Sequence, residues 1–424
     1  MRQLTLDNGL RVVLDARGDA PAVGVAVHYG TGFRGDPVGR SGFAHLFEHL
    51  MFQGSGRVAP GEHFSVVQGS GGTAGGSTHQ DHTDFYQVAP TAALERLLFL
   101  EADRMAGLRL TEEGLRAQLR VIREEIRTQV TGRPYGGFPW TVLPGVLYTS
   151  YANGHNGYGD IEGLHDVTPE ECAAFHETHY APSRAVLTVS GGFDETEAAE
   201  LVRRHFGPLP PRPAATPVSL AEPPPAGTRT GTHEDGHAPL PALALGHRMP
   251  DPARRLPAYA AHMVLSALLT GTASGLLTHR LVAKTGLAAA VRSACGFFGP
   301  LLARDPDTFH VVVTLRPETS PDDVLAETDD VLRLLGRQGP TPGELERTRA
   351  QIRVSLARGH DSLLQRTRQT GTFTLLHNRA ALADDLPGLV AATGADDVAA
   401  AARSLLSTPR AVLDLRTTRE AAPA

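Results

Sequence analysis

The stretch GFAHLFEHLMF, residues 42–52, contains the spacing H-x-x-E-H at His45, Glu48 and His49. On a helix, positions i and i+4 lie about 40° apart around the axis and about 6 Å along it, so both imidazoles can reach one metal ion. Zinc favours such nitrogen and oxygen donors, and a catalytic zinc site keeps one position open for water. The stretch therefore predicts a helix with two zinc ligands, and Glu48 is placed to accept a proton from that water.

The pattern needs a third ligand, because an amphipathic helix with two partly exposed histidines would show the same five residues. The stretch QLRVIREEI, residues 118–126, offers Glu124 and Glu125, the second of them 76 residues after His49. A single glutamate in such a charged helix usually belongs to a solvated face. The spacing alone leaves the third ligand open.

Composition limits the classes of partner. The chain has 424 residues, enough for two or three domains, with a net charge of −6 and few aromatic residues, so we expect no nucleic-acid partner. Its two cysteines, Cys172 and Cys295, form no C-x-x-C pair, which argues against a disulfide framework or a thiolate zinc site. No apolar run approaches the roughly 18 residues that cross a bilayer, and no secretory apolar region is recognisable. We therefore expect a cytoplasmic protein without a membrane partner.

A proline-dense segment divides the chain almost in half. Prolines gather between residues 207 and 227, where neither a helix nor a central strand could continue. The expected organisation is an N-terminal zinc-binding catalytic domain at residues 1–210, a linker at 211–230 and a C-terminal domain without metal ligands at 231–424.

Three short matches between the halves indicate a duplication. Residues 183–189 resemble 409–415, residues 111–126 resemble 341–356, and residues 41–42 resemble 274–275, at offsets of 226, 230 and 233. Within each half, strand-like runs such as 22–28 and 309–315 alternate with amphipathic helices. We expect an α+β fold of two homologous domains, each a mainly antiparallel sheet covered by helices. The third match aligns His45 with Thr278 and His49 with Val282, and the second aligns Glu125 with Ser355, so the second copy lacks the ligands.

Taken together, these motifs resemble the pitrilysin family of zinc metallopeptidases, the inverzincins, and within it the mitochondrial processing peptidase and its bacterial relatives. The resemblance covers nearly the whole chain. Besides the metal motif, the matching stretches are LDNGLRV (6–12), THQD with Thr83 and Tyr86 (78–86), EADRM (101–105), VIREEI (121–126) and YAPS with GGFD (180–194).

The resemblance implies a zinc-dependent endopeptidase of the hydrolase class that cuts peptides or unfolded segments inside a closed chamber, each chain forming a half-shell. It makes His45, His49 and Glu125 the zinc ligands and Glu48 the general base. Glu125 is preferred to Glu124 because the family's ligand directly precedes the apolar residue that Ile126 matches here.

Two departures from the family lie near the expected metal. Seven residues before the ligand glutamate, where many members carry a supporting glutamate, this chain has Gln118, which puts zinc affinity and rate in doubt. The family's substrate strand usually reads G-G-x-x-N-A-x-T, but here Gly75 replaces the asparagine, while Thr78 is retained. This strand can still pair with a substrate strand.

A third departure lies in the second half. Active members or their partner subunits carry an arginine in S-R-L and a tyrosine in G-L-x-Y that reach the substrate and the oxyanion, whereas this chain has Leu276 and Ala289 at these positions. We therefore expect a heterodimer with a homologous subunit that lacks the zinc motif and supplies this pair. The alternatives are a homodimeric peptidase of the same family and a non-catalytic subunit for peptide binding or assembly.

Overall fold

Two compact units, each assembled from three segments, make up the chain. The computed structural model describes residues 1–159, 162–213 and 216–418. The first unit contains Met1–Glu124, Gly157–Val218 and Ala357–Asp384, and the second contains Glu125–Asn156, Ser219–Leu356 and Asp385–Ala424. Among the described residues, no helix combines the length and the apolar character that crossing a bilayer would require.

The first unit is built on a six-stranded, mainly antiparallel sheet in the order β1-β2-β6-β3-β5-β4, with one parallel pair, β2 with β6. Its central strands are rich in buried valine and leucine, as expected for strands covered on both faces. The strands are β1 (Arg2–Thr5), β2 (Arg11–Ala16), β3 (Ala22–Tyr29), β4 (Thr73–Thr78), β5 (Thr83–Pro90) and β6 (Ala185–Gly191).

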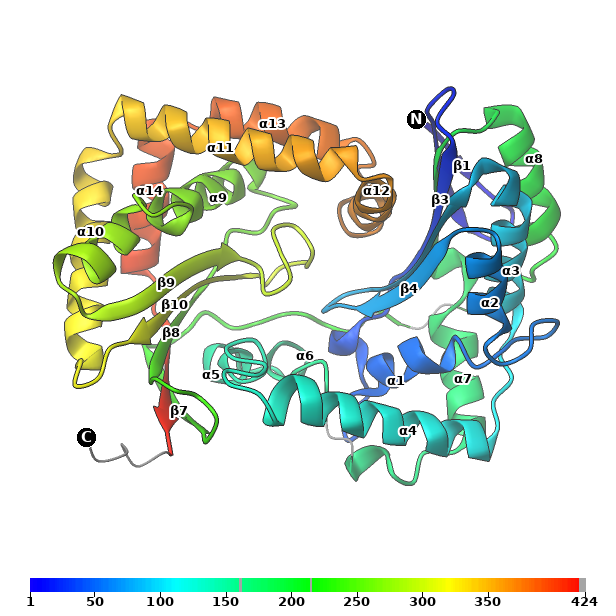
Figure 1. Ribbon diagram of the computed structural model, residues 1–424, viewed down its shortest axis with the longest axis horizontal. Helices are drawn as coiled ribbons and strands as arrows, with labels where there is room; N and C mark the ends of the chain where they lie inside the picture. Colours follow the sequence, from blue (N-terminus) through cyan, green and yellow to red (C-terminus); the bar gives the residue numbers. More distant parts are fainter. Residues whose placement is uncertain (160–161, 214–215, 419–424) are drawn as a thin grey trace. The chain divides into compact units, whose positions relative to one another are not determined.

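Helices cover both faces of this sheet (Figure 1). On one face α3 contacts β3 and β5, α8 contacts β2, and the short helices α1 and α2 contact β4; α12 covers β3, β5 and β6. The helices that belong wholly or mainly to this unit are α1 (Phe43–Leu50), α2 (Glu62–Gly69), α3 (Leu94–Ala106), α4 (Glu112–Ile126), α7 (Pro169–His179), α8 (Glu195–Phe206) and α12 (Leu363–His377).

The second unit repeats the connections of the first. Its sheet has the order β7-β11-β8-β10-β9, again with one parallel pair, β7 with β11, among antiparallel ones. The strands are β7 (Arg229–Asp235), β8 (Ala242–Arg248), β9 (Ala288–Cys295), β10 (Thr308–Leu315) and β11 (Ala411–Thr417). Its helices are α5 (Leu143–Leu147), α6 (Tyr151–Gly154), α9 (Leu256–Thr270), the π-helical η6 (Thr278–Lys284), α10 (Pro321–Gln338), α11 (Pro342–Asp361), α13 (Leu382–Ala392) and α14 (Ala395–Ser407).

The common topology agrees with two of the three matches between the halves and corrects the third. β6 and β11 hold the same place in their sheets, and α4 and α11 are the matched long helices. However, the first helix after β8 is α9, so α9 and not η6 takes the place of α1. The alignment of His45 with Thr278 is therefore wrong, because two shared residues, Ser and Gly, cannot fix a register.

The compact units differ from the contiguous halves expected around the proline-dense segment, because each half contributes a helix to the other unit's sheet. Small residues let α12 approach the first sheet closely: a Cβ on Gly371 would lie 2.3 Å from the His28 ring, and one on Gly24 would lie 2.4 Å from Thr367 Oγ1. In the same way α5, which follows α4, packs on β7, β8 and β11 through Leu143 and Leu147. Apolar faces of both sheets are thereby covered.

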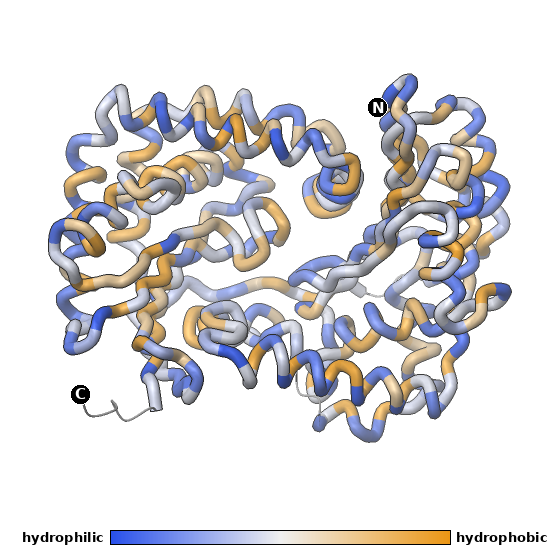
Figure 2. Tube along the Cα trace, viewed as in Figure 1, coloured by the Kyte–Doolittle hydropathy of each residue, from blue (hydrophilic) through white to orange (hydrophobic). Residues whose placement is uncertain are grey.

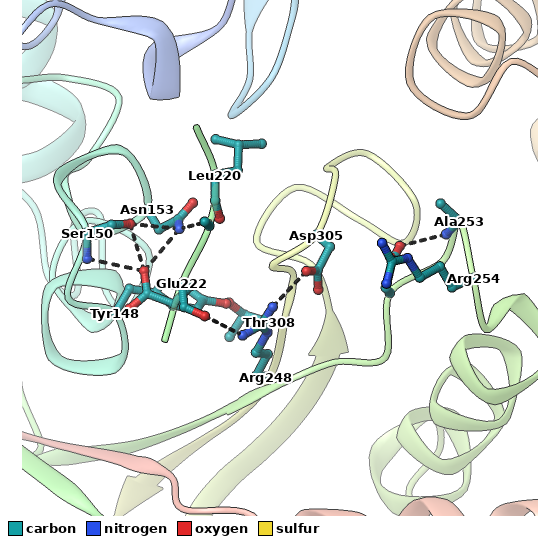
Figure 3. Close-up of polar contacts among 12 residues, drawn as sticks. Tyr148, Ser150, Asn153, Leu220, Glu222, Arg248, Ala253, Arg254, Asp305 and Thr308 are labelled. Carbon is teal, nitrogen blue, oxygen red and sulfur yellow. Dashed lines mark hydrogen bonds and ion pairs between the residues drawn. The ribbon is translucent and has the colours of Figure 1, made fainter. Parts of the chain in front are cut away.

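Glu222 anchors the expected linker segment to the second unit (Figure 3). Its Oε1 accepts from Thr149 N at 2.6 Å and Thr149 Oγ1 at 2.7 Å, and its Oε2 accepts from Ser150 Oγ at 2.7 Å and Asn153 Nδ2 at 3.0 Å. Arg248 adds a bond from Nη1 to the Glu222 carbonyl at 3.1 Å. Residues 214 and 215 of the expected linker lie outside the described residues.

Because of the Glu222 carboxylate, the free energy of unfolding should depend on pH. Partial burial would raise its pKa, but the bonds from Thr149, Asn153 and Ser150 outweigh this and lower the pKa of Glu222 to about 2. Because the unfolded value is 4.5, this contribution to stability is complete above pH 4.5 and is lost as the pH falls towards 2.

We expect Glu222→Gln to lower the free energy of unfolding at pH 7 by on the order of 1 kcal/mol, and the difference from wild type to shrink below pH 4. Urea unfolding at pH 7 and pH 3 measures this, with Glu346→Gln, an exposed carboxylate on α11, as the matched control. A difference between Glu222→Gln and wild type that does not change with pH would contradict the expectation.

Candidate metal centre

The helix that carries the metal motif is fixed at its N-terminus by a buried carboxylate. Asp36 Oδ2 accepts from Gly42 N at 2.6 Å, and Asp36 Oδ1 accepts from Ala44 N at 2.8 Å. Gly42 has φ +93°, and a Cβ there would lie 2.7 Å from the Tyr158 carbonyl oxygen, so glycine is required. Phe43 and Phe47 bury the opposite side of α1. These contacts fix the direction in which the motif's histidines point.

The structure brings the three predicted ligand side chains together. One ligand atom each of His45, His49 and Glu125 lies within 4.8 Å of the other two, and the two imidazole centroids are 5.0 Å apart. His45 is buried, and His49 and Glu125 are half-buried. The division into units falls between Glu124 and Glu125, but both belong to the unbroken helix α4, so Glu125 stays fixed to the first unit.

This donor set fits zinc. Two imidazole nitrogens and one carboxylate oxygen form a common three-ligand set of catalytic zinc sites, with a fourth position for water. Glu124, the other candidate from the sequence, is exposed and does not belong to the group.

Glu48 of α1 lies beside the metal ligands, and its carboxylate is held by a residue of strand β4. Thr78 Oγ1, at the end of β4, donates to Glu48 Oε2 at 2.7 Å, and a Cβ on Gly76 of β4 would lie 3.1 Å from Glu48 Cγ. Burial raises the pKa of Glu48, opposed in part by the Thr78 bond and the two histidines. A carboxylate with a raised pKa is a stronger proton acceptor, which suits a general base at neutral pH.

The remaining predicted residues have the following positions. A Cβ on Gly75 would lie 2.6 Å from Tyr86 Oη, so the Tyr86 side chain occupies the space that the family's asparagine would need. Gln118 is half-buried two helical turns before Glu125 on α4.

Comparison with known proteins agrees with this geometry. Residues 11–133 match the family described as Insulinase (Peptidase family M16), and residues 166–352 match the one described as Peptidase M16 inactive domain. The chain is 28% identical to the zinc protease PqqE of Helicobacter pylori over 349 residues, which are 81% of this chain and 76% of that protein. The chain belongs to peptidase family M16. The resemblance to the pitrilysin family is thereby confirmed.

Two further proteins are similar to this chain over almost its whole length. The mitochondrial-processing peptidase subunit beta of Lentinula edodes is 22% identical, over 95% of this chain and 86% of that protein. The crystal structure of a protease from Helicobacter pylori has a TM-score of 0.88 at 24% identity and covers 98% of this chain and 99% of that one. The expected α+β fold of two helix-covered sheets is therefore confirmed as the M16 fold.

The second M16 unit has a cavity of about 580 Å³ in the place that corresponds to the metal centre, lined by α9, β9 and α11. Along α9, Met263, Ser266 and Ala267 line it at the same i, i+3, i+4 spacing as His45, Glu48 and His49. On α11, Ser355, the residue matched to Glu125, also lines it. None of these four is a usual zinc ligand, so the copy lacks donors at the positions matched to His45, Glu48, His49 and Glu125, although Cys295 and His310 also line the cavity.

The positions where the family resemblance places an arginine and a tyrosine provide no polar side chain here. Leu276 is half-buried before η6, and Ala289 is exposed at the start of β9. At these two positions the second unit therefore offers neither group.

Sequence reasoning missed the contacts around the centre. His79 is half-buried and His82 is buried, and together with Asp84 they form a second group with ligand atoms within 4.8 Å. The Tyr158 ring lies 5.2 Å from His45, from a segment with no motif of its own. Among these contacts, only that of Asp36 had a signal in the sequence, because Asp36 lies six residues before Gly42 at the start of the metal motif.

Proposed function

We propose that this M16 chain is the zinc-bearing subunit of an endopeptidase that cleaves peptides or unfolded segments. The observation that supports it is the convergence of His45, His49 and Glu125 with Glu48 beside them. Each of the four has the type and position that metal-assisted hydrolysis needs.

The protein's own residues account for the proton transfers. Bound zinc would supply a Lewis acid that polarises the scissile carbonyl and acidifies a water molecule. Glu48 takes the proton of the attacking water and returns it to the leaving amine, since one carboxylate can act first as base and then as acid. Thr78 holds Glu48 Oε2, and in the proposed mechanism Oε1 takes the proton.

The edge strand β4 supplies the expected substrate platform. It pairs with β5 on one side and ends the sheet, so its other edge can accept a peptide as an added strand. Gly75 and Gly76 present backbone with little side-chain bulk, and Gly76 lies beside Glu48. Substrates must therefore be extended or unfolded.

A homologous partner subunit would complete the site, in a chamber that the two chains enclose. Leu276 and Ala289 offer no donor to a developing oxyanion, and loss of such a donor typically costs about 10²–10³ in kcat. A likeness to a protein named as a subunit of a processing peptidase supports this arrangement.

The proposal is tested with an internally quenched unstructured peptide, given to the chain alone and with a homologous subunit that carries S-R-L and G-L-x-Y. We expect chelator-sensitive cleavage, faster by about 10²-fold with the partner. Equal rates for the chain alone would favour a homodimer. Absence of cleavage together with less than one zinc per chain would favour a non-catalytic subunit for peptide binding.

A further inference from the structure

The strand β4 has few side chains to fix its register. Its sequence is TAGGST, and within the described part of the chain it pairs only with β5. Strands rich in glycine are weakly specified in register, because a slip loses little packing. Yet β4 carries Thr78, whose hydroxyl bonds Glu48, so the position of the proposed base depends on the placement of a weak strand.

On the face of the sheet opposite Glu48, Arg368 of α12 binds both strands. Ser77 pairs with Asp84 in the ladder, directly next to the Thr78 pair, and successive residues point to opposite faces. Arg368 Nε and Nη2 donate to Asp84 Oδ2 and Oδ1 at 2.6 and 3.0 Å, and Nη2 also donates to Ser77 Oγ at 2.9 Å. The guanidinium carbon lies 4.4 Å from the centre of the Tyr86 ring.

We call these contacts of Arg368 with Asp84, Ser77 and Tyr86 the Arg368 clamp. The clamp spans two successive ladder positions on this face, because Asp84 pairs with Ser77 and Tyr86 pairs with Gly75. A planar guanidinium that makes several bonds at once fixes geometry better than a single ammonium contact. The clamp therefore opposes slippage of β4 along β5.

Asp84 depends on this arginine for its countercharge. The carboxylate is buried, with His28 Nε2 and His79 Nε2 each 3.7 Å from its oxygens. Burial lowers the pKa of His28 to about 4 and also lowers that of His79, so both rings are neutral at pH 7. The guanidinium thus supplies the positive charge beside Asp84, although Arg368 lies 284 residues further along the chain.

We propose that Arg368 is a positioning residue for the peptidase reaction: through the clamp it holds β4 so that Thr78 meets Glu48 and the strand edge is presented to the peptide. This inference rests on the proposed function. It assigns to α12, a helix from the second half of the sequence, a role in the first unit's centre.

The first test needs no activity. Arg368→Met combined with Asp84→Asn removes both charges together, so that no unpaired buried charge remains. Hydrogen exchange of residues 73–78 should accelerate about tenfold or more, with zinc content unchanged. The matched control is Arg366→Met on the same helix, which loses a bond to Asp15 at 2.7 Å on another strand and should leave exchange in β4 unchanged. Unchanged exchange in the clamp variant would overturn the proposal.

The second test is a double-mutant cycle for kcat/KM. We expect a fall of about 30-fold for the clamp variant, about 5-fold for Thr78→Val, and about 30-fold for their combination, because loss of the clamp removes both the Thr78 contact and the presentation of the strand edge, so Thr78→Val costs nothing more once β4 is released. Multiplying effects, near 150-fold, would show that Arg368 does not act through Thr78 and would overturn the proposal. A wild type without peptidase activity would refute the proposed function, while the exchange experiment would still decide on the clamp.

Discussion

Glu48→Gln is expected to lower kcat by about 10³-fold while leaving one zinc per chain. Glutamine keeps the size of the side chain and can still accept the Thr78 bond, but it cannot take a proton from water. Zinc stays bound because Glu48 is held by β4 and does not belong to the ligand group. Steady-state cleavage of a quenched peptide, together with metal analysis of the same sample, measures both quantities.

The matched control for this substitution is Glu62→Gln, which changes a carboxylate in the first turn of the neighbouring helix α2. It should leave kcat within about twofold, as surface changes usually do. A fall of less than tenfold in kcat for Glu48→Gln would contradict the role of this residue as general base. Loss of zinc in that variant would instead show that Glu48 binds the metal.

The second large effect is expected for the ligand on α4. Glu125→Gln should weaken zinc binding by at least about 100-fold, more than loss of an outer-shell partner typically costs. Activity should disappear with the metal and return in part at high zinc concentration. Competition with a chromogenic chelator measures the affinity.

Glu124→Gln is the matched control, because Glu124 is adjacent in sequence but exposed and outside the ligand group. Its zinc affinity should equal that of the wild type. If Glu124→Gln loses the metal and Glu125→Gln keeps it, the arrangement of ligands on α4 is wrong.

Much of the fold was predictable because its signals are local. Strand-like runs at 22–28 and 309–315 correspond to β3 (Ala22–Tyr29) and β10 (Thr308–Leu315), and the match between 111–126 and 341–356 corresponds to α4 and α11. Helical periodicity placed His45 and His49 on one face. The exchange of α5 and α12 between the units was not predictable, since an apolar helix face does not specify which sheet it will cover.

The residues of the candidate site that belong to a sequence motif could be predicted, and the others could not. Glu125 was selected by family resemblance, and its half-buried position beside the histidines agrees with that choice. The second copy was placed incorrectly at Thr278, where the similarity was limited to two residues. Arg368 had no signal at all, because its partners Ser77 and Asp84 lie far away in the sequence and ion pairs leave no periodic pattern.

The central claim is a three-ligand zinc site on this chain, and zinc K-edge X-ray absorption on the purified protein tests it most directly. We expect about one zinc per chain, with two imidazoles and carboxylate or water oxygens at about 2.0–2.1 Å. Glu125→Gln should lose this signal and Glu124→Gln should keep it. A protein without stoichiometric zinc, or a metal shell without imidazole, would contradict the claim.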